Sequence, residues 1–165
     1  MDEYIDLFDN NKKNTGIVIP RTKEMELPEG KHILVSALLV MNSENKIMMQ
    51  LTSKSKGNIL SLPSGHVLHG ESSKDTIVRE MYEEQGLKID KNKINLVEER
   101  LANRIAFFDI YYIKADYKKE DMLLQKDEVE DIIWMTPEEI FDAFNNGKVR
   151  KSSVDSIRNF INNNI

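Results

Sequence analysis

The chain has 165 residues, of which 40% are hydrophobic and 31% are charged, a composition that predicts one soluble globular domain, residues 1–165. Its formal net charge of −5 argues against nucleic-acid or anionic-membrane partners, which bind mainly clustered lysine and arginine, and no apolar run has membrane-spanning length. The absence of cysteine excludes disulfides, zinc–thiolate sites and thiol nucleophiles.

The N-terminal segment, residues 1–30, is predicted to be an extension to the core. Its first residues, MDEYIDLFDN, are acidic and lack the layout of a signal peptide, so we expect a cytoplasmic protein. Ile5–Phe8 and Gly16–Pro20 flank a turn-rich run, Asp9–Asn14, and predict a β-hairpin. Arg21–Lys31 contains a proline and a glycine and predicts a connecting loop.

The next segment is predicted to form two antiparallel strands. His32–Met41 is rich in Val, Leu and Ile, Asn42–Asn45 has the composition of a turn, and Lys46–Leu51 alternates weakly between apolar and polar residues. Thr52–Asn58 then predicts a polar loop.

The pattern of the next segment predicts a helix. Ser72 and Ser73 are good N-cap residues, Lys74–Gln85 contains neither Gly nor Pro, and Gly86 is the type of residue that commonly ends a helix. At about 100° per residue, apolar side chains share one face and carboxylates the nearly opposite one. The apolar residues are Ile77, Val78, Met81 and Tyr82, and the carboxylates are Glu80, Glu83 and Glu84.

Beyond residue 87, the patterns predict three strands and two helices. The strands are Ile94–Ala102, Ile105–Ala115 and Glu128–Met135. The first helix has Thr136 as N-cap, Pro137 at its first position and Gly147 at its end, and the last helix is capped by Ser152 or Ser153. This order of elements predicts an α/β fold, with a mixed sheet covered by helices on both faces.

The three helix carboxylates point to a metal site. Because side chains at i, i+3 and i+4 are neighbours, their negative charges repel one another, and a cation would offset that repulsion. Carboxylate oxygens suit Mg²⁺ or Mn²⁺, which leave further positions for water and substrate phosphate. Arg79 lies one turn before Glu83 and can hold a carboxylate in place. An acidic, solvated helix face is the alternative interpretation of the same residues.

The helix and the loop before it resemble a known motif. The stretch GHVLHGESSKDTIVREMYEEQGL, residues 65–87, satisfies every fixed position of the Nudix box. The matching positions are Gly65, Glu71, Arg79, Glu80, Met81, Glu83, Glu84, Gly86 and Leu87. The chain is therefore similar to the Nudix hydrolases. By element order the resemblance covers roughly residues 31–146, and its specific support lies near the box.

This resemblance implies a fold and a reaction. The fold is an α/β/α sandwich with a mixed sheet, here with the N-terminal β-hairpin as an extension. The reaction is the metal-dependent hydrolysis of a diphosphate linkage in a nucleoside diphosphate-linked or similar small substrate. Matching positions imply Glu80 and Glu84 as principal metal ligands, Glu83 as a ligand or water-activating base, Arg79 as an orienting residue, and Glu71, Gly65 and Gly86 as supports.

Two further candidates lie outside the box. Nudix proteins usually carry Leu-Pro-Gly-Gly at its start, and this chain has Ser64 in place of the first glycine. Since the carbonyl at that position can ligate metal in the family, Ser64 is a candidate ligand through its backbone. Several Nudix proteins carry an acidic residue at a place similar to Glu128, which makes Glu128 a candidate general base. A solvated loop carboxylate is the alternative for Glu128.

Other side chains are candidates for binding the substrate. Four cations have the charge to bind phosphates: Lys54, Lys56, Arg100 and Arg104. A mobile surface loop is an equal alternative for the lysines. Four aromatic residues could stack on a base, although core packing is favoured for them: Phe107, Phe108, Tyr111 and Tyr112. The expected partner is a small diphosphate molecule, and a homodimer is a candidate assembly because many Nudix proteins are dimers.

Two alternatives to hydrolysis remain open at this point. The N-terminal IDLFD and NNKKNTG segments, with the GHVLHGE loop, resemble the Nudix branch related to isopentenyl-diphosphate isomerase. Those isomerases use a cysteine in the loop before the box, and this chain has none. The other alternative is a nucleotide-binding sensor that does not turn over its ligand, which the intact set of box glutamates disfavours.

Overall fold

The computed structural model describes residues 2–22 and 25–164. Met1 and Ile165, at the ends of the predicted domain, and Lys23 and Glu24, in the predicted connecting loop, lie outside the described residues. The strands are β1 (Tyr4–Phe8), β2 (Asn14–Pro20), β3 (Ile33–Met41), β4 (Ile47–Thr52), β5 (Leu60–Ser61), β6 (Ser64–His66), β7 (Asn95–Ala102), β8 (Ala106–Lys114) and β9 (Val129–Met135). The helices are α1 (Ser73–Gln85), α2 (Pro137–Asn145) and α3 (Lys151–Asn164), with short 3₁₀ turns at Lys54–Lys56 and Lys119–Asp121.

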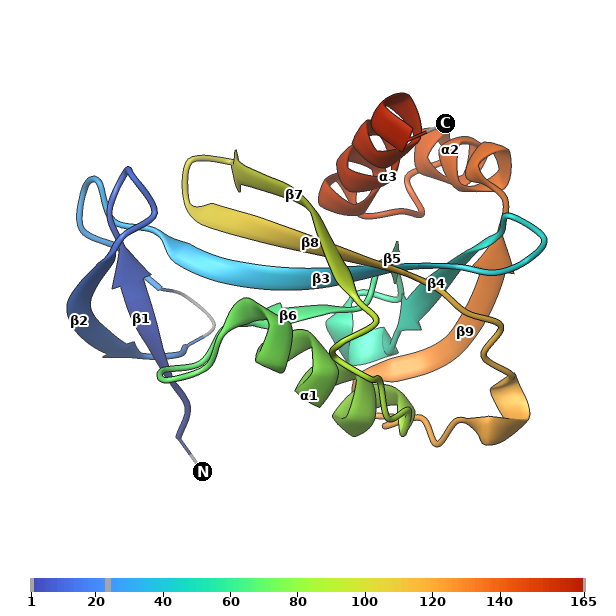
Figure 1. Cartoon of the computed structure of the whole chain (residues 1–165), viewed down its shortest axis with the longest axis horizontal. Coiled ribbons are helices and arrows are strands. Elements are labelled where there is room, and N and C mark those ends of the chain that lie inside the picture. The colour runs from blue at the N-terminus through green and yellow to red at the C-terminus, as the bar shows by residue number, and fades with distance from the viewer. Residues whose placement is uncertain (1, 23–24, 165) are drawn as a thin grey trace.

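The N-terminal hairpin forms as predicted and packs on one end of the main sheet. β1 and β2 pair antiparallel, and the backbones of Phe8 and His32 exchange two hydrogen bonds of 2.8 Å. Ile5 and Leu7 of β1 are buried against Ile33 at the start of β3. The hairpin therefore lies beside the N-terminal end of β3 (Figure 1).

The main sheet is mixed and divides into two parts. β3 and β4 pair antiparallel where Met41 lies opposite Ile47, at the turn that joins them. β3 pairs parallel with β8 and antiparallel with β6, whereas β4 pairs antiparallel with β5 and β9. β3 and β4 share a turn but pair with different strands along most of their length. This divergence leaves room between β3 and β4 for a site.

Helices cover both faces of this sheet, which confirms the predicted α/β/α arrangement (Figure 1). Side chains alternate along β3, so Leu38 and Val40 pack with α1, and Leu39 and Met41 pack on the opposite side with α2 and α3. Both layers are closely buried, since Leu38, Leu39 and Val40 have no exposed surface. None of the described helices has the length and apolarity that a bilayer crossing requires.

Some local predictions were wrong. Tyr82 was expected on the packed face of the box helix, but it is 56% exposed, because the sheet covers only the stripe that contains Ile77 and Met81. The last helix begins at Lys151, before the two serines predicted to cap it. The short strands β5 and β6 were not predicted, since two or three residues give no periodicity to recognise.

Candidate active site

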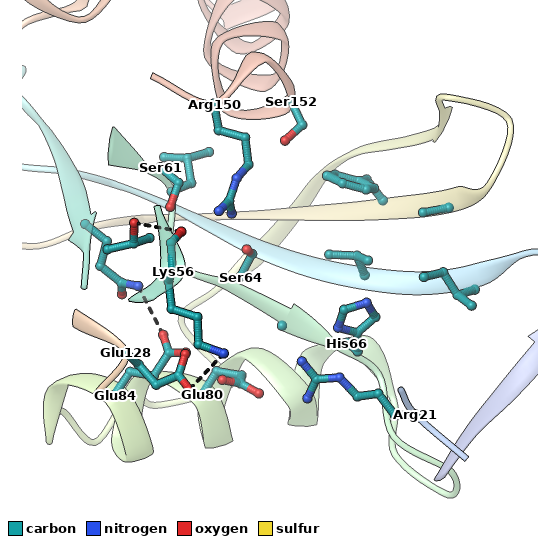
Figure 2. A pocket seen from close by; sticks show the side chains of 18 of the residues that line it. Arg21, Lys56, Ser61, Ser64, His66, Glu80, Glu84, Glu128, Arg150 and Ser152 are labelled. Carbon is teal, nitrogen blue, oxygen red and sulfur yellow. Dashed lines mark hydrogen bonds and ion pairs between the residues drawn. The ribbon is translucent and has the colours of Figure 1, made fainter. Parts of the chain in front are cut away.

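A cleft of about 520 Å³ opens beside the carboxylate face of α1. Its walls come from β3 and β8, from the segment that contains β5 and β6, from the N-terminal hairpin and from the residues before α3. Glu80, Glu83 and Glu84 line it together with Glu128. Figure 2 shows Glu80, Glu84 and Glu128 gathered at one end of the cleft, with Arg150 entering from the other side.

The ends of α1 fix the register of these glutamates. The Ser72 hydroxyl accepts a hydrogen bond of 3.1 Å from the Asp75 backbone N–H and caps the first turn. Gly86 adopts a φ of 71° and ends the helix, and its backbone N–H donates to the Tyr82 carbonyl. A side chain at position 86 would also press on Leu123, whose backbone nitrogen would lie 3.0 Å from the added Cβ.

Gly65 is required by the close approach of Glu80. A Cβ on Gly65 would lie 2.5 Å from both Cγ and Cδ of Glu80, far inside van der Waals contact. Gly65 itself lies in β6 with ordinary strand conformation, so its need for glycine comes from space and not from backbone strain. The glycine therefore sets where the Glu80 carboxylate lies.

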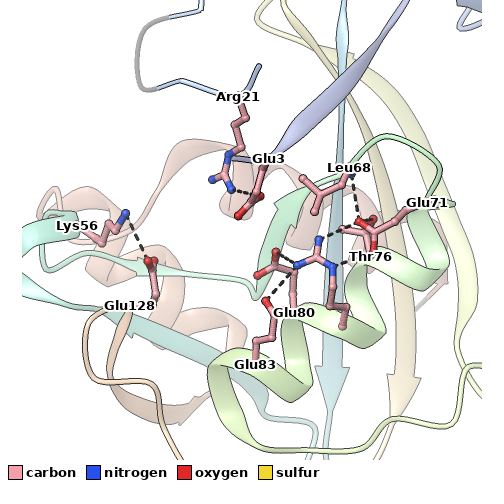
Figure 3. A network of polar contacts seen from close by, with 10 residues as sticks. Glu3, Arg21, Lys56, Leu68, Glu71, Thr76, Glu80, Glu83 and Glu128 are labelled. Carbon is pink, nitrogen blue, oxygen red and sulfur yellow. Dashed lines mark hydrogen bonds and ion pairs between the residues drawn. The ribbon is translucent and has the colours of Figure 1, made fainter. Parts of the chain in front are cut away.

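Arg79 joins Glu71, Glu80 and Glu83 into one network. Figure 3 shows the three carboxylates of this network. Its guanidinium donates to both oxygens of Glu71, at 2.8 and 3.0 Å, and its Nη1 also donates to Glu80 at 3.0 Å and to Glu83 at 3.1 Å. The hydrogen bonds to Glu71 and the neighbouring carboxylates raise the pKa of Arg79 above its ordinary value, although burial opposes them. Glu71 thus holds Arg79, and Arg79 holds two of the box glutamates.

Glu84 and Glu80 form a crowded, largely buried pair. Burial, together with the negative charge of Glu80, raises the pKa of Glu84 to about 8. Burial also raises the pKa of Glu80, against the opposing charge of Arg79. Gln50 donates a hydrogen bond of 3.1 Å to Glu84 and accepts one of 2.5 Å from Gln85, which fixes the Glu84 side chain toward the cleft. Two carboxylates forced together in this way favour a cation beside them.

The residues present fit a hard divalent cation by their chemistry. The donors are carboxylate oxygens at the edge of a water-accessible cleft, as Mg²⁺ and Mn²⁺ prefer. Among residues 2–22 and 25–164, no group of three or more His, Asp or Glu side chains already has the spacing of a complete metal site. Glu80 and Glu83 instead face Arg79.

Comparison with known proteins identifies the family of this chain. A model of the NUDIX domain matches residues 30–159, which is most of the chain. The chain belongs to the Nudix hydrolase family. The match begins just before β3 and ends within α3, so it leaves out the N-terminal hairpin.

Relatives of this Nudix hydrolase support the assignment. It is 31% identical over 148 residues to an uncharacterised Nudix hydrolase of Listeria monocytogenes, a match that covers 85% of this chain and 83% of that protein. An uncharacterised Nudix hydrolase of Listeria innocua is 28% identical over 144 residues, with the same coverage. A crystal structure from Deinococcus radiodurans shares the fold, with a TM-score of 0.81 at 21% identity, and covers 95% of this chain and 98% of that one.

Of the polar candidates predicted outside residues 65–87, Ser64, Glu128 and Lys56 line the cleft of this Nudix hydrolase. Ser64 lies in β6, in the extended backbone that any residue adopts. Glu128 lies at the carboxylate end, where its charge contributes to the raised pKa of Glu84 after the larger effects of burial and Glu80. The Lys56 ammonium lies 3.5 Å from the Glu128 carboxylate.

Three predicted cations do not line the cleft. Lys54 is exposed on the 3₁₀ turn, and Arg104 is exposed at the tip of the β7–β8 hairpin. Arg100 is used structurally: its guanidinium donates at 2.9 Å to the Ser152 carbonyl and at 2.9 Å to the Ser156 hydroxyl, and it lies over the Phe108 ring. It therefore ties α3 to β7.

Other residues of the cleft were missed by the sequence analysis. Arg21, at the end of the hairpin, and Arg150, before α3, both line it, as does Gln50 of β4. Among the predicted aromatics, Phe108 lines the cleft, whereas Tyr111 is buried and donates to or accepts from the Ser73 hydroxyl at 2.7 Å. Neither arginine lies in a local motif, so only the tertiary fold could identify them.

Proposed function

We propose that this Nudix hydrolase cleaves a diphosphate linkage in a small, nucleotide-like substrate, with Mg²⁺ or Mn²⁺ held by Glu80, Glu83 and Glu84. The observation that carries the proposal is the buried Glu80–Glu84 pair at one end of a cleft whose other walls carry arginine and lysine. Carboxylates alone would repel a diphosphate, and the cations alone could not activate water. Together they support binding of a metal–diphosphate complex.

Each residue then has a distinct task. When bound, the metal would lower the pKa of a water molecule and offset charge on the diphosphate oxygens. Arg79 keeps Glu80 and Glu83 in position through its hydrogen bonds to both, and Glu71 anchors Arg79. Gly65 leaves the space that Glu80 occupies. The Ser64 carbonyl is a further proposed ligand, since serine fits at this place without backbone strain.

The first prediction concerns the buried carboxylate pair. Because burial and Glu80 raise the pKa of Glu84 to about 8, this carboxyl must take up a proton when the metal-free protein folds at neutral pH, which lowers stability. Glu84→Gln keeps the shape and avoids that cost, so the metal-free variant should unfold at a higher temperature than wild type. Each kcal/mol gained in the free energy of unfolding raises Tm by about 2–4 °C for a chain of this size. Thermal unfolding in EDTA measures this. Addition of Mn²⁺ should stabilise wild type more than the variant, and equal Tm values for both proteins under both conditions would exclude the pair as a metal site.

Glu128 is the proposed general base. Its carboxylate faces the cleft and is held by Lys56, so it is placed to accept a proton from a water that attacks the diphosphate. Glu128→Gln should lower kcat by about 100-fold with a smaller change in KM. Lys56→Gln is the matched control, because it breaks the same ion pair and keeps the carboxylate. Unchanged kcat in Glu128→Gln would return this residue to the role of a solvated loop carboxylate and leave Glu83 as the candidate base.

The alternatives have less support. No observation favours an isoprenoid-diphosphate isomerase, whose cysteine the chain lacks. A sensor would bind a nucleotide under Mg²⁺ and Mn²⁺ without turnover, and a turnover assay separates it from a hydrolase. A cytoplasmic location and a homodimer stay predictions.

A further inference from the structure

Among the described residues, four arginine or lysine side chains line the cleft, and their partners set one of them apart. Arg79 is bound by Glu71, Glu80 and Glu83. Arg21 pairs with Glu3 at 3.1 Å, and Lys56 pairs with Glu128 at 3.5 Å. The Arg150 side chain has no hydrogen bond or ion pair to any residue in the ranges 2–22 and 25–164. Its charge is therefore available to a ligand in the cleft.

Unpaired hydroxyls accompany Arg150. Ser61 is only 2% exposed and lines the cleft, yet its hydroxyl has no hydrogen-bond partner among the described residues. Because Ser61 lines the cleft, its hydroxyl can donate a hydrogen bond to a ligand there. Ser152 also lines the cleft, and its backbone carbonyl is used by Arg100 while its hydroxyl is not. Figure 2 shows Arg150 and Ser61 pointing into the same part of the cleft, across from the glutamates.

The backbone holds these groups together although they are distant in sequence. Leu60 of β5 donates from its N–H to the Lys148 carbonyl and accepts from the Arg150 N–H, each at 2.9 Å. The Leu62 N–H donates to the Ser153 hydroxyl at 2.9 Å. The chain before and after Ser61 is thus fastened to the chain around Arg150, so this group of residues is preformed and not left to loop motion.

We propose that Arg150, Ser61 and Ser152 form an oxyanion subsite that binds a phosphate group of the substrate away from the metal. A guanidinium with neighbouring hydroxyl donors is the chemistry that recognises a phosphate. The subsite rests on the proposed function, because it assigns the substrate class of the same cleft. It implies a substrate with at least two phosphates, one at the glutamates and one at Arg150.

The test uses imidodiphosphate, a diphosphate analogue with a P–N–P link, in the presence of Mg²⁺. Arg150→Gln should weaken its binding, measured by calorimetry, by about tenfold or more, and Arg150→Lys should recover part of it. Ser61→Ala should weaken binding by a smaller factor. Lys151→Gln is the matched control: it removes the same charge from the next residue, which pairs with Asp155 outside the cleft. It should bind the probe as wild type does.

Two controls separate the subsite from the metal site and from folding. Because the Arg150 side chain has no polar partner within the part of the chain that the structure describes, Arg150→Gln should keep the wild-type Tm. Titration with Mn²⁺ alone reports metal binding by the glutamates. If the wild-type protein did not bind Mn²⁺, the proposed function would be contradicted, independently of Arg150. Normal Mn²⁺ binding with equal probe affinity in Arg150→Gln and Lys151→Gln would overturn the subsite, as would no binding of the probe to wild type.

Discussion

Replacing Glu83 by glutamine should lower kcat by about 100- to 1,000-fold on the true substrate and leave the fold intact. Glu83 is the box glutamate nearest to solvent, with a side chain 51% exposed, so its loss costs little packing. Its carboxylate is held by Arg79 at 3.1 Å, and glutamine keeps the size and one acceptor oxygen but removes the charge that we propose binds metal or activates water. Steady-state kinetics under saturating Mg²⁺ measure the loss.

Glu130→Gln is the control for this result. Glu130 is an exposed carboxylate on β9 that does not line the cleft, so its neutralisation changes the net charge equally. Its kcat should match wild type, and both variants should unfold within a few degrees of it. Wild-type turnover in Glu83→Gln would mean that the box helix is not the centre of the reaction.

Gly65→Ala should abolish most activity through geometry alone. The new methyl group would lie 2.5 Å from Glu80 Cδ, so the Glu80 side chain must rotate out of its place beside Glu84. A displaced ligand typically costs about 100-fold in rate. Mn²⁺ affinity, measured by calorimetry, should fall together with kcat, because the same carboxylate serves both.

Gly16→Ala gives the opposite signature and serves as its control. Gly16 has a φ of 81° and open space around it, so alanine there costs stability through backbone strain, about 1 kcal/mol, without touching the cleft. It should lower Tm and keep Mn²⁺ affinity. If Gly65→Ala lowered Tm in the same way but bound Mn²⁺ normally, the close contact with Glu80 would not be what positions the metal site.

Local patterns in the sequence were sufficient for the long elements and for the box. α1 has a serine cap, an uninterrupted body and a glycine end, so each signal agrees with the others. The same holds for α2, where Thr136 and Glu139 form a capping box and Pro137 opens the helix. Hydrophobic runs likewise identified β3 and β8, which are buried on both faces over most of their length.

The rest of the cleft depends on contacts between distant segments. Arg100 and Arg150 are both arginines near apolar segments, and the sequence does not distinguish them. Because α3 packs on β7, the Arg100 guanidinium is hydrogen-bonded to α3, whereas Arg150 lines the cleft. Similarly, the reason for Gly65 became visible only once β6 and α1 were placed side by side. Sequence spacing defines neighbours within one helix, whereas a substrate site joins several elements.

A phosphate-coupled hydrolysis assay tests directly whether the protein is a metal-dependent diphosphate hydrolase. The panel would hold nucleoside triphosphates, nucleotide sugars, ADP-ribose, dinucleoside polyphosphates and coenzyme derivatives, each with Mg²⁺, with Mn²⁺ and with EDTA. We expect turnover of one substrate class that depends on the metal and is lost in Glu83→Gln. Silence across the panel while Mn²⁺ binds to wild type, or turnover that persists in EDTA, would contradict a metal-dependent diphosphate hydrolase.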